Sequence, residues 1–509
     1  MKTTDFLREL HRRGITVSVD SNELEVTAPK GALSSNLLGQ LARRKSELIK
    51  AIKSLRGFSE GRERIPLLER GSGDRAEFIV SFAQQRLWFL HQLFPDNPFY
   101  NQPIIRRLSG KLDVSALQAS LNGLVARHET LRTTFPTNGE APLQVIAQPG
   151  PVELDVGDLS ALPEREREAK ARRCVEVECQ RPFDLSDGPL FRVQLLRLSN
   201  EDHILQLTLH HIISDGWSIP VLYRDLGTIY QASCAGSAPS LPPLPIQYAD
   251  FSVWQRQWLT GSVLSKQLAY WRDRLKGIPE LQLPTDRARP AFLSYAGACE
   301  TLKLSPQLSA ALRSLARNEG VTLYMVLLAA FNVLLQRYTH QDDLPVGSPI
   351  ATRTRTELEE LIGSFVNSLV MRTDVSGDPG FTELLARVHR VTLDAFVHQD
   401  LPFERLVEEI DPQRELNRNP LFQVMFAVQN APDNESPFMG PDLTISDFSG
   451  GMQTTRFDLE VHIWEAIEQL RVDFVYSTDL FDAATIRRML VHYERLLEGV
   501  VADPECRLS

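Results

Sequence analysis

The sequence predicts a mixed α/β fold built from more than one domain. Segments with the apolar pattern of strands, such as residues 204–213, are interspersed with segments of helical spacing, such as residues 322–338. The chain has 509 residues. A single hydrophobic core rarely serves more than about 250–300 residues, so we expect two to four domains.

A small first domain is predicted at residues 1–56, with the element order α-β-β-α-α. Val17 and Val19 alternate with polar residues, and so do Leu24 and Val26. The turn formers between these two segments predict a β-hairpin. Apolar residues recur at helical spacing before and after the hairpin, which accounts for the three helices.

Residues 57–75 are charged and glycine-rich without a lasting period, so we interpret them as a linker. The body of the chain begins near Phe78, and the proline-rich segment 239–245 is expected to connect two lobes. Either Asp113 or Ser115 is expected to cap the second helix of the body. The predicted body elements are helices at 81–90, 117–131, 322–338, 386–397 and 403–410, and strands at 204–213 and 365–371.

Charge and cysteine content exclude several classes of protein. The net charge is −10, so the chain offers no broad basic surface for nucleic acid. Residues 1–60 nevertheless hold 11 Lys and Arg against 7 Asp and Glu, so a basic head precedes an acidic body. Five cysteines without C-x-x-C spacing indicate a cytoplasmic protein with neither a disulfide framework nor a metal site. No secretory signal is recognisable, and the most apolar stretch, 323–335, is too short to span a membrane.

The segment HHIISDG at residues 210–216 ends a predicted strand and carries the clearest chemistry. In an extended strand, His211 shares a face with three leucines, and partial desolvation there favours the neutral, basic imidazole. Such a group suits acyl transfer. His210 points to the opposite face and is expected to be structural.

The residues after the histidines are predicted to shape the loop. Asp215 is expected to hold the loop by pairing with an arginine, and Gly216 supplies the backbone freedom that a tight turn needs. The amide of Gly216 or of Trp217 is placed to face a developing oxyanion. On this pattern alone, the alternative that both histidines are ordinary core and surface residues stays open.

Seven motifs in order resemble the condensation domain of non-ribosomal peptide synthetases, and the resemblance covers essentially all of residues 78–509. The HHIISDG segment is the third motif and is similar to the family pattern H-H-x-x-x-D-G. One departure is Ser368, where the family usually has Thr. The seven motifs lie at residues 81–90, 127–135, 210–216, 248–255, 362–368, 398–404 and 418–422.

The resemblance implies two lobes, each like chloramphenicol acetyltransferase, set in a V-shaped pseudo-dimer around a tunnel. The lobes are placed at residues 76–245 and 246–509. The implied activity is that of an amide-forming acyltransferase: the amine of an acceptor aminoacyl thioester attacks a donor acyl or peptidyl thioester. Both substrates are carried on 4′-phosphopantetheine of upstream and downstream peptidyl carrier proteins, with no cofactor bound directly. The motifs resemble the subtype that joins an L-configured donor to an L-configured acceptor.

Residues 1–56 resemble the small TubC-like docking domains of synthetases that begin with a condensation domain. This resemblance implies a module that binds the C-terminal tail of an upstream synthetase subunit, by strand addition or along the hairpin. Its positive charge predicts an acidic tail, and the alternative is a stabilising N-terminal cap. Residues 503–509 resemble a connector to an adenylation domain, which we expect to follow in the same polypeptide. The predicted partner contacts are Val17, Val19, Leu24, Val26, Arg43 and Arg44.

Within this resemblance, His211 is the catalytic residue. An α-amino group has a pKa of about 8, so a strong base is unnecessary, and His211 either removes a proton or orients the amine. Arg132 is the first candidate partner of Asp215, and Arg353 is the second.

Three further residues are assigned by the resemblance. Trp217 and Ser218 are expected to line the tunnel, while Asn367 either lies near the channel or caps a strand. His128 lies on an apolar helix stripe and is expected to be a packed core histidine.

Two other functions are alternatives. A stand-alone CoA-dependent acyltransferase would use the same histidine loop, but residues 447–451 only partly resemble the motif of that group and lack its tryptophan. A non-catalytic recruitment domain is the second alternative, and the intact His211, Asp215 and Gly216 argue against it.

Overall fold

The chain forms two compact units, Met1–Pro66 and Leu67–Ser509. The structure is a computed structural model. It describes residues 16–20, 23–27, 64–71, 73–139, 141–292, 294–410, 417–429, 443–448, 454–466 and 468–508.

The first unit contains the predicted hairpin. β1 (Thr16–Asp20) pairs antiparallel with β2 (Glu23–Thr27), and this confirms the two strands. The three predicted helices of this unit, together with Arg43 and Arg44, lie outside the described residues.

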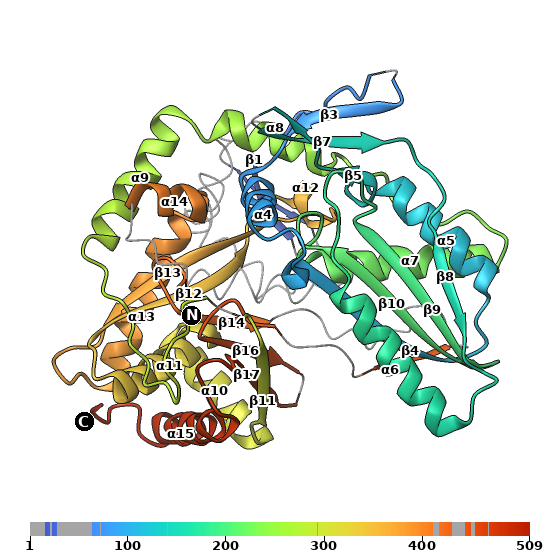
Figure 1. Cartoon of the computed structure of the whole chain (residues 1–509). Coiled ribbons are helices and arrows are strands. Elements are labelled where there is room, and N and C mark those ends of the chain that lie inside the picture. Colours follow the sequence, from blue (N-terminus) through green and yellow to red (C-terminus); the bar gives the residue numbers. More distant parts are fainter. Residues whose placement is uncertain are drawn as a thin grey trace. The chain divides into compact units, whose positions relative to one another are not determined.

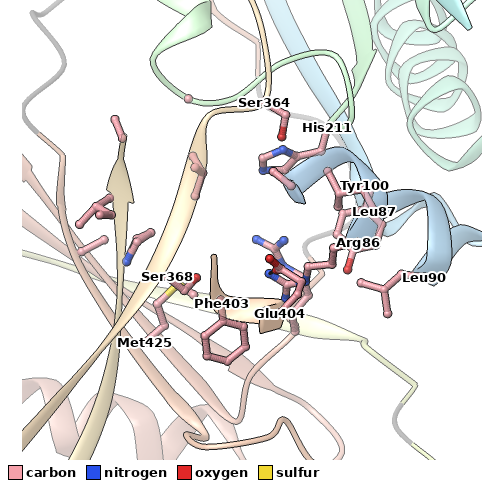
Figure 2. A pocket seen from close by; sticks show the side chains of 18 of the residues that line it. Arg86, Leu87, Leu90, Tyr100, His211, Ser364, Ser368, Phe403, Glu404 and Met425 are labelled. Atoms are coloured by element: carbon pink, nitrogen blue, oxygen red, sulfur yellow. Dashed lines mark ion pairs between the residues drawn. The ribbon is translucent and has the colours of Figure 1, made fainter. Parts of the chain in front are cut away.

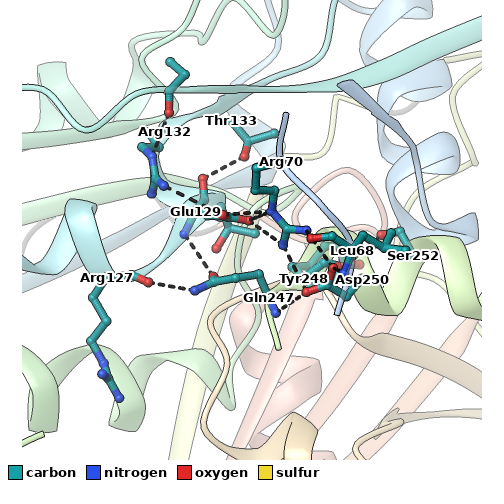
Figure 3. Close-up of polar contacts among 12 residues, drawn as sticks. Leu68, Arg70, Arg127, Glu129, Arg132, Thr133, Gln247, Tyr248, Asp250 and Ser252 are labelled. Carbon is teal, nitrogen blue, oxygen red and sulfur yellow. Dashed lines mark hydrogen bonds and ion pairs between the residues drawn. The ribbon is translucent and has the colours of Figure 1, made fainter. Parts of the chain in front are cut away.

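The second unit begins at Leu67, inside the predicted linker 57–75. Arg70 donates hydrogen bonds to both carboxylate oxygens of Glu129, each at 3.0 Å, and to both of Asp250, at 2.7 and 3.0 Å (Figure 3). The backbone amide of Leu68 also donates to Asp250, at 2.9 Å. Arg70, one of the charged residues that suggested a solvated linker, is instead paired with two buried carboxylates of the larger unit.

The N-terminal lobe is built on a five-stranded sheet with the order β15-β4-β10-β9-β8 (Figure 1). Alternate leucines of β10 pack with α5 (Val114–Arg127) and α7 (Ser218–Cys234) on one face. Residues of opposite parity pack with α6 (Glu164–Gln180) on the other face. The strands are β4 (Asn101–Gly110), β8 (Leu154–Asp158), β9 (Phe191–Ser199), β10 (Asp202–His210) and β15 (Leu443–Asp447).

One strand of this sheet comes from the C-terminal half of the chain. β15 pairs antiparallel with β4 and places Ile445 opposite Leu108. Arg106 Nη1 lies 2.6 Å from Asp447 Oδ1 across the same pair of strands. The predicted division at residue 246 therefore needs correction, because the second half of the chain completes the sheet of the first lobe.

The C-terminal lobe has a six-stranded mixed sheet with the order β11-β17-β16-β14-β12-β13, in which β14 is parallel to both neighbours. Several helices pack against it and enclose the larger core, among them the four given below (Figure 1). The strands are β11 (Gly297–Lys303), β12 (Asp343–Ala351), β13 (Val366–Asp374), β14 (Val424–Gln429), β16 (Leu459–Glu465) and β17 (Leu470–Ser477). The helices are α10 (Pro306–Glu319), α11 (Leu323–Thr339), α13 (Phe381–Val397) and α15 (Ala483–Ala502).

Most predicted body elements are confirmed. α11 and β13 lie where helical and strand patterns were recognised, and α14 (Phe403–Ile410) has the predicted bounds. Ser81 caps α4 (Phe82–Leu93), and Asp113 rather than Ser115 caps α5. The remaining elements are α8 (Tyr248–Trp258), α9 (Gly261–Leu275), α12 (Thr356–Glu359), β3 (Arg75–Ile79), β5 (Thr133–Thr134), β6 (Thr137–Asn138), β7 (Ala141–Ala147), and the 3-10 helices η1 (Pro98–Tyr100) and η2 (Glu129–Arg132).

Among the described residues, no single helix has the length and apolar composition to cross a membrane. In the part of the chain that the structure describes, one pair, α10 and α11 taken together, meets those two criteria, and the pair is bent by 105°.

Candidate active site

A cavity of about 1870 Å³ lies between the two lobes of the second unit. One wall is formed by α4, η1 and the loop after β10, and Figure 2 shows Arg86, Tyr100 and His211 on that side. The opposite wall is formed by the C-terminal sheet, whose alternate residues face the cavity, among them Ser368 and Met425. The volume exceeds the roughly 300–1000 Å³ of a pocket for one small ligand.

His211 lies at the cavity wall, one residue beyond the strand. β10 ends at His210 rather than at residue 213, and the backbone amide of His211 donates to the Tyr100 carbonyl at 2.7 Å. The imidazole is half-buried and points into the cavity (Figure 2). Its Nδ1 is buried and has no hydrogen-bond partner among the described residues, so Nε2 is the nitrogen that is open to a substrate.

The environment of His211 keeps its imidazole neutral. Burial, followed by the cations of Arg456 and Arg86, lowers the pKa of His211 to about 4, against the opposing effect of Asp215. A neutral imidazole at physiological pH can accept a proton at Nε2. The ring is therefore unprotonated, as it must be to accept either a proton or a hydrogen bond from an amine.

His210 is fully enclosed behind the loop. Its Nδ1 accepts a hydrogen bond from the backbone amide of Ile212 at 3.1 Å, and its ring meets that of Phe183 edge-on, with centroids 5.8 Å apart. Burial is the main reason that the pKa of His210 lies well below its ordinary value. Because Nδ1 accepts, the proton of the neutral ring resides on Nε2.

Asp215 joins the histidine loop to the C-terminal lobe. Its Oδ1 accepts from Arg353 Nη2 at 3.1 Å and from both the amide and hydroxyl of Ser218, at 2.8 and 2.7 Å. Its Oδ2 accepts from the amide of Phe365 at 3.0 Å. All four donors are buried, so the carboxylate anchors the loop from both lobes at once.

Arg353, and not Arg132, is the partner of Asp215, which reverses the predicted order of the two arginines. Arg132 donates to the carbonyls of Ala147 at 2.7 Å and Val125 at 3.0 Å. Arg132 is the last residue of η2 on the N-terminal lobe, and its guanidinium donates to backbone carbonyls of that lobe. Arg353 follows β12 of the other lobe and stacks over the Phe365 ring at 4.1 Å.

Two residues predicted for the tunnel belong to the framework instead. Ser218 is fully buried, and its hydroxyl accepts from the Gly363 amide at 3.1 Å, so the prediction that it lines the tunnel is wrong. Asn367 donates to the carbonyls of Gln399 at 3.0 Å and Leu401 at 2.8 Å and accepts from the Phe403 amide at 2.9 Å, so it joins β13 to the start of α14 and does not line the cavity. Its strand neighbours face the cavity because successive strand residues point to opposite sides.

Gly216 and Trp217 both line the cavity, and Trp217 is 51% exposed. Gly216 does not have a left-handed φ, and a Cβ placed on it would meet no atom within 4 Å. The predicted need for backbone freedom at Gly216 is therefore not supported, and the missing side chain leaves open space in the cavity. Gly363 is the opposite case, since a Cβ there would lie 2.0 Å from the Tyr248 ring.

An ion pair that the sequence reasoning missed lies inside the cavity. Arg86 Nη1 of α4 lies 3.0 Å from Glu404 Oε1 of α14, and Figure 2 shows the two side chains together below His211. Both residues occur within two of the seven motifs, so each could have been named as a candidate from the sequence. Nothing in the chain's periodicity, however, indicates that the two helices face each other.

A second missed group lies on the C-terminal wall. Glu460 Oε2 is 3.3 Å from His462 Nε2, and Glu460 Oε1 accepts from the backbone amide of Arg456 at 3.0 Å. Burial opposes ionisation of Glu460, but the hydrogen bond from His462 and the Arg456 cation lower its pKa to about 2. This wall therefore carries a fixed anion and, on Arg456, a cation.

Comparison with known families matches two segments of the chain. Residues 74–509 match the family model of the condensation domain, and residues 4–53 match that of the TubC N-terminal docking domain.

Similar proteins include one of the linear gramicidin synthase proteins of Brevibacillus parabrevis, which is 47% identical over 84% of this chain and 6% of its own length. Chondramide synthase cmdD of Chondromyces crocatus is 44% identical over 84% of this chain and 11% of its own. Phosphinothricin tripeptide synthetase PhsC of Streptomyces viridochromogenes is 42% identical over 87% of this chain and 41% of its own length. The chain thus spans a small part of the first relatives that it matches.

Solved structures share the fold over most of the second unit. The X-domain from teicoplanin biosynthesis has a TM-score of 0.78 and 30% identity, covering 88% of this chain and 99% of that one. SgcC5 from Streptomyces globisporus has a TM-score of 0.70 and 29% identity, covering 84% and 100%. The first condensation domain of the CDA synthetase has a TM-score of 0.72 at 23% identity, covering 85% and 98%.

Proposed function

The chain belongs to the condensation domain family, and from this premise we propose that it forms peptide bonds in non-ribosomal peptide biosynthesis. The donor is an acyl or peptidyl thioester and the acceptor an aminoacyl thioester, each tethered to 4′-phosphopantetheine of a peptidyl carrier protein. The observation that carries the proposal is the neutral His211, which faces a cavity bounded by both lobes.

The proposed reaction requires one proton acceptor at the reacting amine. The acceptor nitrogen attacks the thioester carbon, and the carbonyl electron pair moves onto oxygen. His211 Nε2 accepts a proton from the nitrogen, the C–S bond breaks, and the proton passes to the leaving thiolate. The products are an amide on the acceptor carrier and a free thiol on the donor carrier. Whether His211 mainly removes the proton or orients the amine, it must be unprotonated for either task.

The cavity fits two tethered substrates better than one free ligand. Its volume of about 1870 Å³ is larger than that of a single-ligand pocket. Residues from α4, α14 and the C-terminal sheet would contact the phosphopantetheine arms, with Arg86, Trp217 and Phe403 among the lining side chains. The arms supply the thioesters, and the chain itself supplies orientation and the proton acceptor.

The docking domain supports a second part of the proposal. Val17 lies opposite Val26 and Val19 opposite Leu24 in the hairpin register, which sets the four apolar residues on one face. We propose that this face, with Arg43 and Arg44, binds an acidic C-terminal tail of an upstream synthetase subunit.

The direct test uses the full chain with two loaded carrier proteins and intact-mass detection of the product on the acceptor carrier. We expect the wild type to transfer the donor and His211→Ala to form little or no amide. His128→Asn is a matched control, because His128 is buried against Asp225 away from the cavity. Equal product in the wild type and His211→Ala would overturn the catalytic assignment, and efficient turnover with acyl-CoA and a free amine would favour the CoA-dependent alternative.

A recruitment function is the second candidate, and one observation favours it. An X-domain that is 32% identical, with a TM-score of 0.77, was solved in a complex with OxyB. If the wild-type chain forms no amide from loaded carriers, this function becomes the better explanation of the fold.

A further inference from the structure

Arg456 approaches the cavity from the C-terminal lobe, just before β16. Its backbone amide donates to Glu460 Oε1 at 3.0 Å, and its carbonyl accepts from the side chain of Asn419. Its guanidinium lies 5.6 Å from the centroid of the Tyr100 ring, which belongs to the other lobe. The backbone is thus fixed on both sides, and the side chain is directed across the lobe boundary.

Tyr100 connects Arg456 to the catalytic histidine. The Tyr100 carbonyl accepts from the His211 amide at 2.7 Å, and the two rings are nearly perpendicular, with centroids 6.5 Å apart. Arg456, Tyr100 and His211 all line the same cavity. The cation and the imidazole therefore flank one tyrosine from opposite lobes.

Arg456 differs from the other cavity arginines in its pairing. Each of the other arginines that line the cavity is paired with a carboxylate: Arg86 with Glu404, Arg224 with Asp225, Arg405 with Glu408 and Arg418 with Glu280. In the part of the chain that the structure describes, no carboxylate lies within ion-pair distance of the Arg456 guanidinium. The neighbouring Glu460 is already occupied, since its oxygens accept from the Arg456 amide, the Thr455 hydroxyl and His462. The half-buried guanidinium lowers the pKa of Glu460 but makes no ion pair with a described carboxylate, so it is suited to meet negative charge that a substrate develops.

We propose that Arg456 stabilises the oxyanion of the tetrahedral intermediate that forms when the acceptor amine attacks the donor thioester. This inference rests on the proposed function. The carbonyl oxygen gains a full negative charge as the nitrogen–carbon bond forms and loses it as the carbon–sulfur bond breaks. A fixed cation stabilises the charged intermediate more than the neutral thioester. It therefore raises the rate of the step and does not only increase the affinity for the substrate.

The same cation acts on His211, which gives a second readout. The charged or titratable groups around the imidazole are Arg86, Tyr100, His210 and Asp215 from its own lobe, and Glu404, Arg456, Glu460 and His462 from the other. Removing the Arg456 charge removes a repulsion from protonated His211, so its pKa rises. The fall in rate that comes from protonation of His211, here called the acidic limb of the rate profile, should then occur at higher pH. A purely structural role of Arg456 would not produce this change.

The experiment measures single-turnover amide formation on the full chain with loaded carriers at several concentrations and pH values. Arg456→Met and Arg456→Gln remove the charge, Arg456→Lys keeps it, and Arg495→Met is the matched control on the exposed surface of α15. We expect about a 10²-fold lower maximal rate in the neutral variants, with unchanged half-saturation by carriers. The Lys variant should keep the acidic limb in place, and the control should match the wild type. Thermal unfolding of each variant reports whether it folds.

Three results would overturn the proposal while leaving the proposed function intact. They are a wild-type rate in folded Arg456→Gln, a loss confined to half-saturation, or a loss confined to donors with acidic side chains, which would make Arg456 a specificity residue. A wild type that forms no amide would instead overturn the proposed function itself, and the role of Arg456 would fall with it.

Discussion

The Arg353 guanidinium and the Asp215 carboxylate form an ion pair between the two lobes, with Nη2 3.1 Å from Oδ1 and neither side chain more than 2% exposed. Asp215 lies four residues after His211 and also binds the amide of Phe365. The loop that presents the His211 imidazole to the cavity is therefore held by a residue of the opposite lobe. Lobe packing and the position of His211 are linked through this one contact.

Replacing Arg353 with Met should destabilise the second unit and impair catalysis. Removing one partner of a buried ion pair leaves the other charge uncompensated, which typically costs about 3–5 kcal/mol in the free energy of unfolding. The freed Asp215 would also release the loop, so the single-turnover rate of amide formation should fall in the molecules that remain folded. Chemical denaturation and intact-mass assays measure the two effects separately.

Arg132→Met is the matched control for this prediction. Arg132 donates to backbone carbonyls and does not touch the histidine loop. Its loss should cost only about 0.5–1.5 kcal/mol per hydrogen bond and leave the rate of amide formation unchanged. Equal losses of activity in the two variants would show that Arg353 has no special relation to the loop.

The pH dependence of amide formation should have two acidic steps. The acceptor amine has a pKa of about 8, so the logarithm of the rate should fall with a slope of one below that value. His211 is neutral down to its pKa of about 4, and its protonation should add a second unit of slope only below that pH. Rates measured from pH 8 to the acid limit of folding, with circular dichroism at each pH, test this shape. A slope of two that begins near pH 6.5 would mean that His211 titrates as an exposed histidine.

Two glycines near the site should respond differently to the same substitution. A Cβ on Gly363 would lie 2.0 Å from the Tyr248 ring, so Gly363→Ala should cost at least about 1–3 kcal/mol, as overpacked sites do. A Cβ on Gly216 would meet nothing within 4 Å, so Gly216→Ala should change the free energy of unfolding by less than about 0.5 kcal/mol. Because Gly216 lines the same cavity as His211, Gly216→Ala should still slow amide formation. A fully active Gly216→Ala would show that the space is not used by substrate.

Local patterns in the sequence were sufficient for many elements of the fold. α14 has its predicted bounds because Pro402 and the apolar spacing mark both ends, and Ser81 caps α4 as a hydroxyl before a helix is expected to do. β10 was predicted too long, because apolar residues 212 and 213 continue its composition into the turn. An apolar pattern indicates which residues are buried, and residues 212 and 213 are buried although they lie beyond the end of the strand.

Contacts between the lobes could not be predicted in the same way. The Asp215 partner is 138 residues away, and either arginine satisfied the charge requirement. The insertion of β15 into the first lobe's sheet, and the meeting of Arg456 with Tyr100, also depend on how two separately folded sheets are placed. His211 was identified because its motif is local, whereas the residues that surround it are assembled from both halves of the chain.

The docking domain offers a test that is independent of catalysis. A synthetic peptide with the last 30 or so residues of the upstream subunit should bind the full chain, and the affinity should fall as salt is raised because exposed charges are screened. Arg43→Glu combined with Arg44→Glu should weaken binding by roughly tenfold or more, since like charges would then face each other across the interface. Titration calorimetry measures both effects.

The matched control reverses Arg12 and Arg13, which lie in the same domain and change its net charge by the same amount. If Arg43 and Arg44 contact the tail, only their reversal should produce the full loss, while the control should show the smaller effect of long-range attraction. Equal weakening by the two double variants would mean that net charge alone attracts the tail. Replacing Val19 with Asp should also abolish binding if the apolar side of the hairpin is the docking face, because a carboxylate would be desolvated there without a partner.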